Sequence, residues 1–201
     1  MKIIGLTGSV GSGKTTVAHI LEKEFGAKVL IADEIGHFFM QPNKEGYQKI
    51  LMEFGEDILE DTKDRENRKI DRKKLAEKVF KDISQLEALN HIIHPLVKEY
   101  LANIIAEERK KGECSYLFIE SALLIEAGYE KICDELWYIT AKEEIRRKRL
   151  KASRNYSDEK ITSILKNQLS DEIFRKKCKK VLENNGDIAE ILQQIKFLLE
   201  I

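Results

Sequence analysis

The chain has 201 residues, and its 35 Lys and Arg residues balance its 35 Asp and Glu residues. Such a balance gives no overall field that attracts nucleic acid, so we expect no nucleic-acid partner. No apolar run approaches the length of a membrane span and the N-terminus resembles a strand, not a signal peptide, so we expect no membrane association and a cytoplasmic location.

The first predicted elements surround a glycine-rich loop. Lys2–Thr7 is short, apolar and rich in β-formers, which is typical of a buried strand. After it, Gly8-Ser-Val-Gly-Ser-Gly-Lys14-Thr15 fits the phosphate-loop pattern G-x-x-x-x-G-K-[ST]. A helix is predicted over Lys14–Phe25. Its apolar face would consist of Val17, Ile20, Leu21 and Phe25.

A strand, a glycine loop and a helix in this order can hold a nucleoside triphosphate. The glycines allow backbone N–H groups to turn toward the phosphates, and the helix N-terminus adds partial positive charge. Lys14 could reach the β- and γ-phosphates, and the Thr15 hydroxyl could bind Mg²⁺. The expected nucleotide-binding residues are Gly8, Gly11, Ser12, Gly13, Lys14, Thr15 and Thr16. The alternative, a glycine turn without a ligand, is disfavoured by the flanking strand and helix.

Asp33 follows the second predicted strand, Lys28–Ile31. A carboxylate at the carboxyl end of a strand could accept a proton from a substrate hydroxyl or hold a water on magnesium. Asp33 could also cap a helix predicted over Glu34–Met40, and the two roles can coexist.

The next strand starts only near Tyr116, more than eighty residues later, which is far more than one crossover helix requires. Because most of this stretch has helical periodicity, we expect an inserted helical lobe that carries a second substrate. Within it, His94-Pro95 is expected to open a long helix over Leu96–Lys110, since proline favours the first helical position.

Two more sites follow in the chain. Glu120 lies at the end of the predicted strand Tyr116–Ser121, where it is either a magnesium partner or a surface carboxylate. A strand over Glu135–Thr140 leads into a strongly basic helix, Lys142–Arg154. Such a run is usually a solvated face, but in a phosphoryl-transfer enzyme a lid arginine stabilises the transferring group. We expect Arg149 or Arg154 to touch phosphate.

The chain closes with a strand over Lys180–Glu183, the turn Asn184-Asn185-Gly186 and an amphipathic helix capped by Asp187. Strands alternating with helices predict an α/β fold with a five-stranded parallel sheet covered by helices on both faces.

Two short matches to GTPase motifs are best explained as accidents. Asp33-Glu-Ile-Gly36 matches the magnesium loop of GTPases but follows the second strand, and Asn43-Lys-Glu-Gly46 lacks the aspartate that would read guanine. A small-molecule kinase fits best. The alternatives are a kinase of another nucleoside or nucleotide and, less favoured, an ATP-dependent binding module.

At this level of detail the chain resembles the dephospho-coenzyme A kinases, a family of phosphate-loop kinases of small molecules. The resemblance extends over nearly the whole chain, because its motifs occur in family order. They are Ile4-Gly-Leu-Thr-Gly-Ser-Val-Gly-Ser-Gly-Lys-Thr-Thr-Val-Ala18, Ala32-Asp33, Phe54-Gly55, Asp71-Arg72-Lys73-Lys74-Leu75, Val79-Phe80, His94-Pro95, Leu123-Leu124 with Glu126, Gln168, and Asn184-Asn185-Gly186.

The resemblance implies transfer of the γ-phosphate of ATP to the ribose 3′-hydroxyl of dephospho-coenzyme A, with ATP and Mg²⁺ as cofactors. It makes Asp33 the general base and places Arg149 and Arg154 near the lid arginines. Asn184, Asn185 and Gly186 would form the adenine loop, and His94, Pro95 and Leu123 would lie near the substrate.

The same resemblance implies one nucleoside-kinase-like domain over residues 1–201. Its core would comprise residues 1–33, 112–140 and 178–201, its coenzyme A lobe residues 34–111, and its lid residues 141–177. The sequence leaves the oligomeric state open.

The chain departs from the family pattern at several points. Glu120 stands where the family usually has Asp, and Ala122 stands where it usually has Pro. Arg149 and Arg154 are one residue further apart than the common pair, and Lys98 replaces a frequent arginine.

Overall fold

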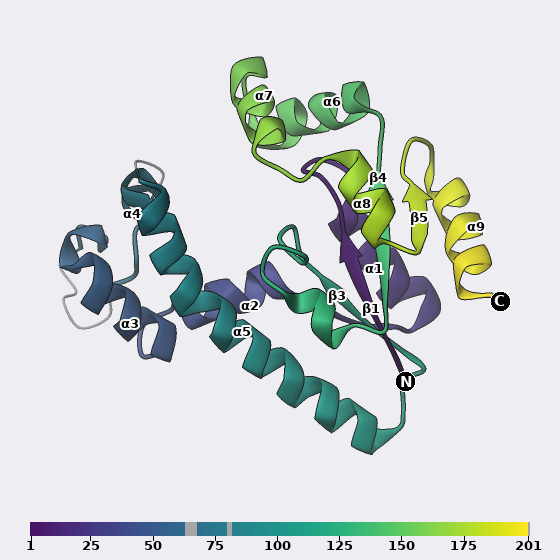
Figure 1. Cartoon of the computed structure of the whole chain (residues 1–201), viewed down its shortest axis with the longest axis horizontal. Coiled ribbons are helices and arrows are strands. Elements are labelled where there is room, and N and C mark those ends of the chain that lie inside the picture. The colour runs from purple at the N-terminus through teal and green to yellow at the C-terminus, as the bar shows by residue number, and fades with distance from the viewer. Residues whose placement is uncertain (63–67, 80–81, 201) are drawn as a thin grey trace. The chain divides into compact units, whose positions relative to one another are not determined.

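The computed structural model describes residues 1–62, 68–79 and 82–200, so Phe80 of the family motif lies outside the described residues. The chain divides into two compact units. The sheet unit comprises Met1–Ile31 and Glu108–Ile201, and the helical unit comprises Ala32–Glu107. Figure 1 labels the elements of both units.

The sheet unit contains five parallel strands in the order β2-β3-β1-β4-β5. They are β1 (Lys2–Thr7), β2 (Lys28–Ile31), β3 (Tyr116–Glu120), β4 (Glu135–Thr140) and β5 (Lys180–Glu183). The five-stranded parallel sheet predicted from the sequence is confirmed; only the third strand ends one residue earlier than expected. Strand β1 is the central strand, and its carboxyl end lies at the point where the strand order reverses. Open α/β sheets bind ligands at this point.

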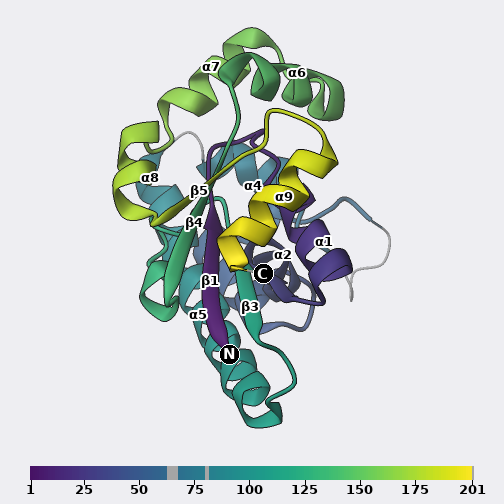
Figure 2. The same cartoon turned by 90° about the vertical axis from the view of Figure 1, so that its right-hand side faces the viewer.

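Helices pack on both faces of this sheet. They are α1 (Lys14–Phe25), α8 (Asp171–Lys177) and α9 (Ile188–Leu199). The helices α6 (Glu143–Arg154) and α7 (Asp158–Lys166) lie beyond the carboxyl end of β4 in Figures 1 and 2. Figure 2 shows α1 and α9 against one face. There, Leu6 and Trp137 pack with Leu21 of α1 and Ile195 of α9 in one buried cluster.

Side chains alternate between the two faces along each strand, so the neighbours of these core residues lie on the opposite face. Tyr138, next to Trp137 in β4, stacks on Phe174 of α8 with 4.8 Å between ring centroids. The predicted apolar face of α1 is confirmed, because Val17, Ile20 and Leu21 are buried and Phe25 packs against the same cluster.

The helical unit is built from α2 (Ala32–Phe39), α3 (Glu45–Phe54), α4 (Arg72–Val79) and most of α5 (Ile83–Lys111), with short 3₁₀ turns at Glu56–Ile58 here and at Tyr129–Ile132 in the sheet unit. The helical unit has a core of its own. It is formed by Tyr47, Ile50, Phe54, Ile58, Leu59, Ile70, Leu75 and Val79.

Two predictions about helix starts are wrong. Pro95 does not open a helix but lies inside α5, which begins at Ile83. Residues of α5 before the proline, among them Leu89 and Ile93, pack on the core of the helical unit, and this burial outweighs the local cost of proline. Asp33 is not an N-cap, because α2 begins at Ala32 and Asp33 lies in its first turn.

Two further predictions, about the start of α9 and the presence of α6, are confirmed. The side chain of Asp187 accepts a hydrogen bond from the Glu190 N–H at the start of α9, and α6 follows β4 as the expected basic helix. In the part of the chain that the structure describes, no helix combines the length and apolar character that crossing a membrane requires.

Candidate active site

The loop between β1 and α1 has the backbone of a phosphate-binding loop. Gly8, Gly11 and Gly13 have φ values of 149°, 77° and 88°, a region that residues with a Cβ rarely occupy. A Cβ at Gly8 would collide with the carbonyl oxygen of Ile139, and one at Gly13 with the Asn184 side chain. The three glycines are therefore required by backbone conformation and by close packing around the loop.

Lys14 lies across this loop. Its side chain is largely buried, and Nζ donates to the Gly8 carbonyl at 2.8 Å and to the Ser9 carbonyl at 3.4 Å. Two backbone carbonyls thus hold the ammonium group against the loop. A polyphosphate in the loop would find this positive charge already in position.

Distant side chains fix the loop conformation. Gln168 accepts a hydrogen bond from the Val10 N–H at 2.9 Å. Asn184 is buried, and its Nδ2 donates to the Ser12 carbonyl at 2.8 Å. Sequence reasoning assigned no role to Gln168, although it stood among the family motifs, and it missed the contact of Asn184 with the loop.

The two lid arginine candidates differ in position. Arg149 donates to the Ser12 carbonyl at 3.3 Å and to the backbone and side-chain oxygens of Asn184 at 3.0 and 3.1 Å. Arg154 is exposed at the end of α6, with its guanidinium 6.0 Å from the Tyr156 ring centroid. Five residues rotate about 140° around an α-helix, so the two side chains leave α6 in different directions. The structure brings only Arg149 to the loop.

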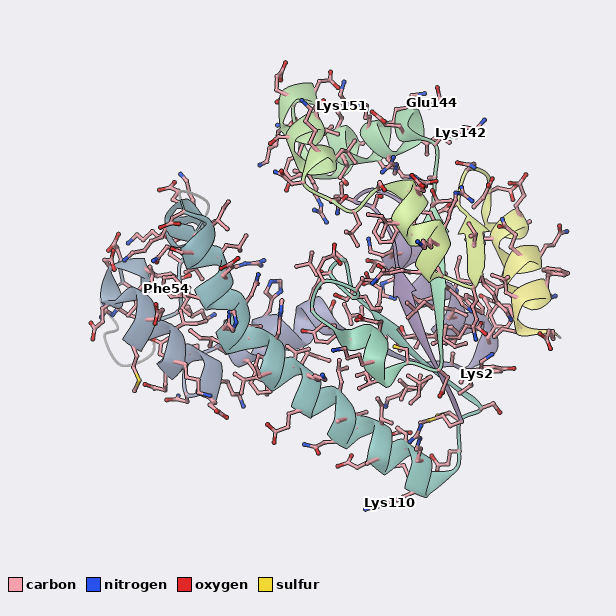
Figure 3. All side chains as sticks on the ribbon, viewed as in Figure 1. Lys2, Phe54, Lys110, Lys142, Glu144 and Lys151 are labelled. Carbon is pink, nitrogen blue, oxygen red and sulfur yellow. The ribbon has the colours of Figure 1, made fainter. Side chains whose placement is uncertain are left out.

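Arg146 is a basic residue that sequence reasoning did not single out. It lies three residues before Arg149 on the same side of α6 and packs against Gly11. Its Nε and Nη1 are buried and have no hydrogen-bond partner among the described residues. Other charged residues of this region are exposed, as predicted for a solvated face, among them Lys142, Glu144 and Lys151 in Figure 3.

A cavity of about 530 Å³ adjoins the loop. Its walls include Gly13, Thr16, Arg149, Asn184 and Gly186. The structure therefore gathers expected nucleotide residues from three distant segments around one space. Asn185 lies beside it in sequence, and its Oδ1 accepts from the Lys142 N–H at 2.7 Å, which ties the turn to the start of α6.

Thr15 and Glu120 supply a pair of oxygen atoms at the carboxyl edge of the sheet. Thr15 is the second residue of α1, Glu120 ends β3, and their Oγ1 and Oε2 atoms are 3.5 Å apart. Glu120 is only 4% exposed. Oxygen ligands, one of them a carboxylate, suit Mg²⁺. Among the residues described, no cluster of three His, Cys, Asp or Glu side chains could hold a metal by itself.

Leu123 and Glu126 lie after β3 in the sheet unit. Leu123 is 41% exposed, and its N–H donates to the Ser121 hydroxyl at 3.2 Å. Burial raises the pKa of Glu126, and the nearby Lys14 ammonium acts in the opposite direction.

The acceptor residues expected from the sequence lie in the helical unit. Asp33 is on α2, and His94 and Pro95 are on α5. Burial lowers the pKa of His94, and the neighbouring Asp33 carboxylate acts in the opposite direction. Asp33 and His94 are thus close enough to interact electrostatically.

The sequence comparisons with known proteins all indicate the same family. The family model described as dephospho-CoA kinase matches residues 2–190. A dephospho-CoA kinase of Dehalococcoides mccartyi is 38% identical over 198 residues, covering 98% of this chain and 96% of the relative. The Aquifex aeolicus dephospho-CoA kinase is 36% identical over 200 residues, covering 100% and 97%.

Solved structures give the same fold. The dephospho-CoA kinase of Campylobacter jejuni superposes with a TM-score of 0.70 at 27% identity, covering 100% of this chain and 96% of that one. A Thermus thermophilus structure gives a TM-score of 0.79 at 32% identity, covering 99% and 96%. Shikimate kinase of Acinetobacter baumannii shares the fold alone, with a TM-score of 0.55 at 17% identity over 100% of this chain and 94% of that one.

Proposed function

Because this chain belongs to the dephospho-CoA kinase family, we propose for it the catalytic assignment developed below. The enzyme transfers the γ-phosphate of ATP to the ribose 3′-hydroxyl of dephospho-coenzyme A, giving coenzyme A and ADP in the last step of coenzyme A synthesis. The observation that carries this conclusion is the family match over residues 2–190, joined to an intact phosphate loop.

The donor half of the proposed site is the phosphate loop. Gly8, Gly11, Ser12 and Gly13 offer backbone N–H groups to the phosphates of ATP, and Lys14 neutralises charge on the transferring group. Thr16 and the turn Asn184-Asn185-Gly186 hold the nucleoside portion. The support for this placement is the cavity that Gly13, Thr16, Asn184 and Gly186 share.

The acceptor half is proposed to lie on the helical unit. Asp33 accepts the proton of the ribose 3′-hydroxyl as its oxygen attacks the γ-phosphorus and the bond to the β-phosphate oxygen breaks. The electrostatic effect of Asp33 on His94 supports this role, because a residue near the base can also contact the ribose. Pro95 and Leu123 complete the proposed acceptor contacts.

Magnesium is proposed to bind at Thr15 and Glu120. The support is the approach of two oxygen ligands, one carboxylate and one hydroxyl, to 3.5 Å at the edge of the sheet. Bound there, the ion would neutralise charge on the phosphates of ATP.

Arg149 and Arg154 are proposed as the lid arginines. Arg149, already hydrogen-bonded to the loop carbonyl of Ser12, would stabilise negative charge on the nucleotide phosphates. Arg154 is exposed, so its contact with phosphate would require the lid to close. Lid closure would also keep water from the γ-phosphate and suppress ATP hydrolysis.

We propose that the chain consists of three parts. The core comprises residues 1–33, 112–140 and 178–201, the coenzyme A lobe residues 34–111, and the lid residues 141–177. A cytoplasmic location is supported by the three free cysteines, since thiols stay reduced in that compartment.

The test is ADP release by the purified protein with magnesium and ATP, measured with and without dephospho-coenzyme A, with the product identified by mass. We expect strong stimulation by the acceptor. Lys14→Ala and Asp33→Asn should each lower kcat/KM about a hundredfold or more, as for other charged groups that act in the transition state. Lys23→Ala, which removes an exposed lysine of the same helix as Lys14, is the matched control. Absence of acceptor stimulation would refute the activity, and near-normal turnover of Asp33→Asn would remove Asp33 from the role of base.

A further inference from the structure

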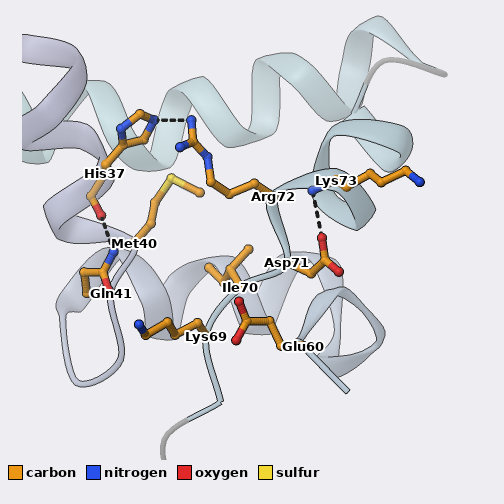
Figure 4. A pocket seen from close by; sticks show the side chains of 9 residues that line it. All are labelled: His37, Met40, Gln41, Glu60, Lys69, Ile70, Asp71, Arg72 and Lys73. Carbon is orange, nitrogen blue, oxygen red and sulfur yellow. Dashed lines mark hydrogen bonds between the residues drawn. The ribbon is translucent and has the colours of Figure 1, made fainter. Parts of the chain in front are cut away.

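The helical unit contains a cavity of its own, of about 390 Å³. Figure 4 shows His37 and Arg72 on one side of it and Lys69 and Glu60 on the other. The chain is held in this shape by backbone hydrogen bonds, in which the Glu60 N–H donates to the Lys69 carbonyl at 2.9 Å and the Asp71 N–H to the Ile58 carbonyl at 2.8 Å.

The cations of this cavity differ from their neighbours in sequence. Three nearby basic residues are paired with carboxylates: Arg68 with Glu56 at 2.7 Å, Lys74 with Asp61 at 2.8 Å and Lys78 with Asp57 at 2.9 Å. By contrast, Lys69 and Arg72 form no ion pair with any residue that the structure describes.

The carboxylates of the cavity do not remove this surplus. Asp71 accepts from the N–H groups of Lys73 and Lys74 at 2.9 and 3.2 Å, at the start of α4. The lining carries three cations, Lys69, Arg72 and Lys73, against the two carboxylates of Glu60 and Asp71, so one positive charge remains. The cavity is therefore suited to an anion.

A histidine orients one of these cations. Arg72 Nη2 lies 2.8 Å from His37 Nε2, and because a guanidinium only donates, Nε2 must accept. Burial and the Arg72 charge lower the pKa of His37, in agreement with a neutral imidazole. The neutral imidazole thus holds the Arg72 guanidinium at the cavity without reducing its positive charge.

One wall of the cavity also lies near the proposed base along α2. His37 is four residues after Asp33 on α2, so both lie on one side of the helix, about one 5.4 Å turn apart. In dephospho-coenzyme A, the 5′-diphosphate is attached to the same ribose as the reacting 3′-hydroxyl. With that hydroxyl at Asp33, the diphosphate lies within reach of His37 and Arg72.

We infer that this cavity binds the 5′-diphosphate of dephospho-coenzyme A, with Arg72 and Lys69 as its cationic ligands and His37 as a positioning residue. This inference rests on the proposed function. The planar guanidinium of Arg72 supplies parallel donors to phosphate oxygens, and Lys69 supplies a point charge from the opposite wall.

The test uses Arg72→Met in the steady-state kinase assay. We expect the KM for dephospho-coenzyme A to rise about tenfold or more, while the KM for ATP stays within about twofold, since only the acceptor loses a charge-assisted contact. Adenosine, measured as a competitive inhibitor toward dephospho-coenzyme A, should keep its inhibition constant because it carries no diphosphate. Lys69→Met should give the same pattern with a smaller effect.

Lys49→Met is the matched control, because it removes an exposed cation of α3 that is paired with Glu45. It should leave all constants unchanged. An unchanged KM for dephospho-coenzyme A in Arg72→Met would overturn the inference, as would a parallel loss of adenosine binding. Failure of the proposed function would be recognised separately, as a wild-type enzyme whose ADP release does not respond to dephospho-coenzyme A.

Discussion

Replacement of Asn184 by alanine is predicted to loosen the phosphate loop and to destabilise the sheet unit. Asn184 is 3% exposed and joins three segments. Its Nδ2 donates to the Ser12 carbonyl at 2.8 Å, and its Oδ1 accepts from Arg149 at 3.1 Å. Alanine removes both side-chain bonds and keeps the backbone bond from the Asn184 N–H to the Thr140 carbonyl.

The magnitude follows from these two bonds. A neutral hydrogen bond contributes about 0.5–1.5 kcal/mol and a bond to a charged group about 1.5–3 kcal/mol. The expected loss in the free energy of unfolding is therefore about 2–4 kcal/mol. For a chain of this size it corresponds to a decrease in Tm of about 10 °C.

Trp137 provides a local probe for this measurement. It is the single tryptophan of the chain and is fully buried in the core of the sheet unit, so its fluorescence during urea unfolding reports on that unit. Asn185→Ala is the control, because it removes two exposed hydrogen bonds, one from the Lys142 N–H and one to the Glu183 carboxylate at 3.3 Å, and should cost less than about 1 kcal/mol. A double-mutant cycle with Arg149→Met should give a coupling energy of about 0.5–3 kcal/mol. Equal stability of Asn184→Ala and Asn185→Ala would refute the conclusion that the Asn184 side chain stabilises the phosphate loop.

Three further predictions concern the metal site, the histidines and the cysteines. Glu120→Gln should raise the Mg²⁺ concentration for half-maximal turnover about threefold or more, because a charged ligand becomes neutral; an unchanged magnesium titration would exclude Glu120 from the site. Burial lowers the pKa of His37 and His94 below the ordinary value of 6.5, so the unfolded chain binds more protons and the free energy of unfolding should fall as the pH drops from 6.5 through the lowered values. Urea unfolding at pH 7.5 and 5.5 measures this slope, and His94→Gln should lose less stability between these pH values than wild type does, whereas equal slopes would argue against it. Burial raises the pKa of Cys133 to about 12 and of Cys178 to about 11, so both should resist iodoacetamide at pH 7 until the protein is denatured; rapid labelling of the native protein, detected by mass spectrometry, would contradict this.

The chemistry of the donor site could be predicted from a short stretch of sequence. The loop Gly8–Thr15 contains its own glycines, its own cation and its own hydroxyl, and the hydrogen bond from Lys14 to the Gly8 carbonyl forms within the stretch. The strands could be predicted for a related reason, since short apolar runs such as Lys2–Thr7 are buried on both sides of a parallel sheet.

Local signals gave the wrong answer where long-range packing competed with them. Pro95 is a start signal for a helix when only its neighbours are considered. In the folded chain, α5 continues through Pro95 because residues on both sides of it are buried by packing. Asp33 was likewise expected to precede its helix, but α2 begins directly after β2.

The sequence by itself determined the phosphate loop, the parallel sheet and, through the ordered motifs, the family and its reaction. Only the tertiary structure decided which side chains support the loop, because those contacts join residues far apart in the chain: Gln168 with Val10 and Asn184 with Ser12. It also distinguished Arg149 from Arg154, which have the same charge and lie on the same helix. The direction in which α6 leaves β4 determines which of the two meets the loop, and no periodicity in the sequence records that direction.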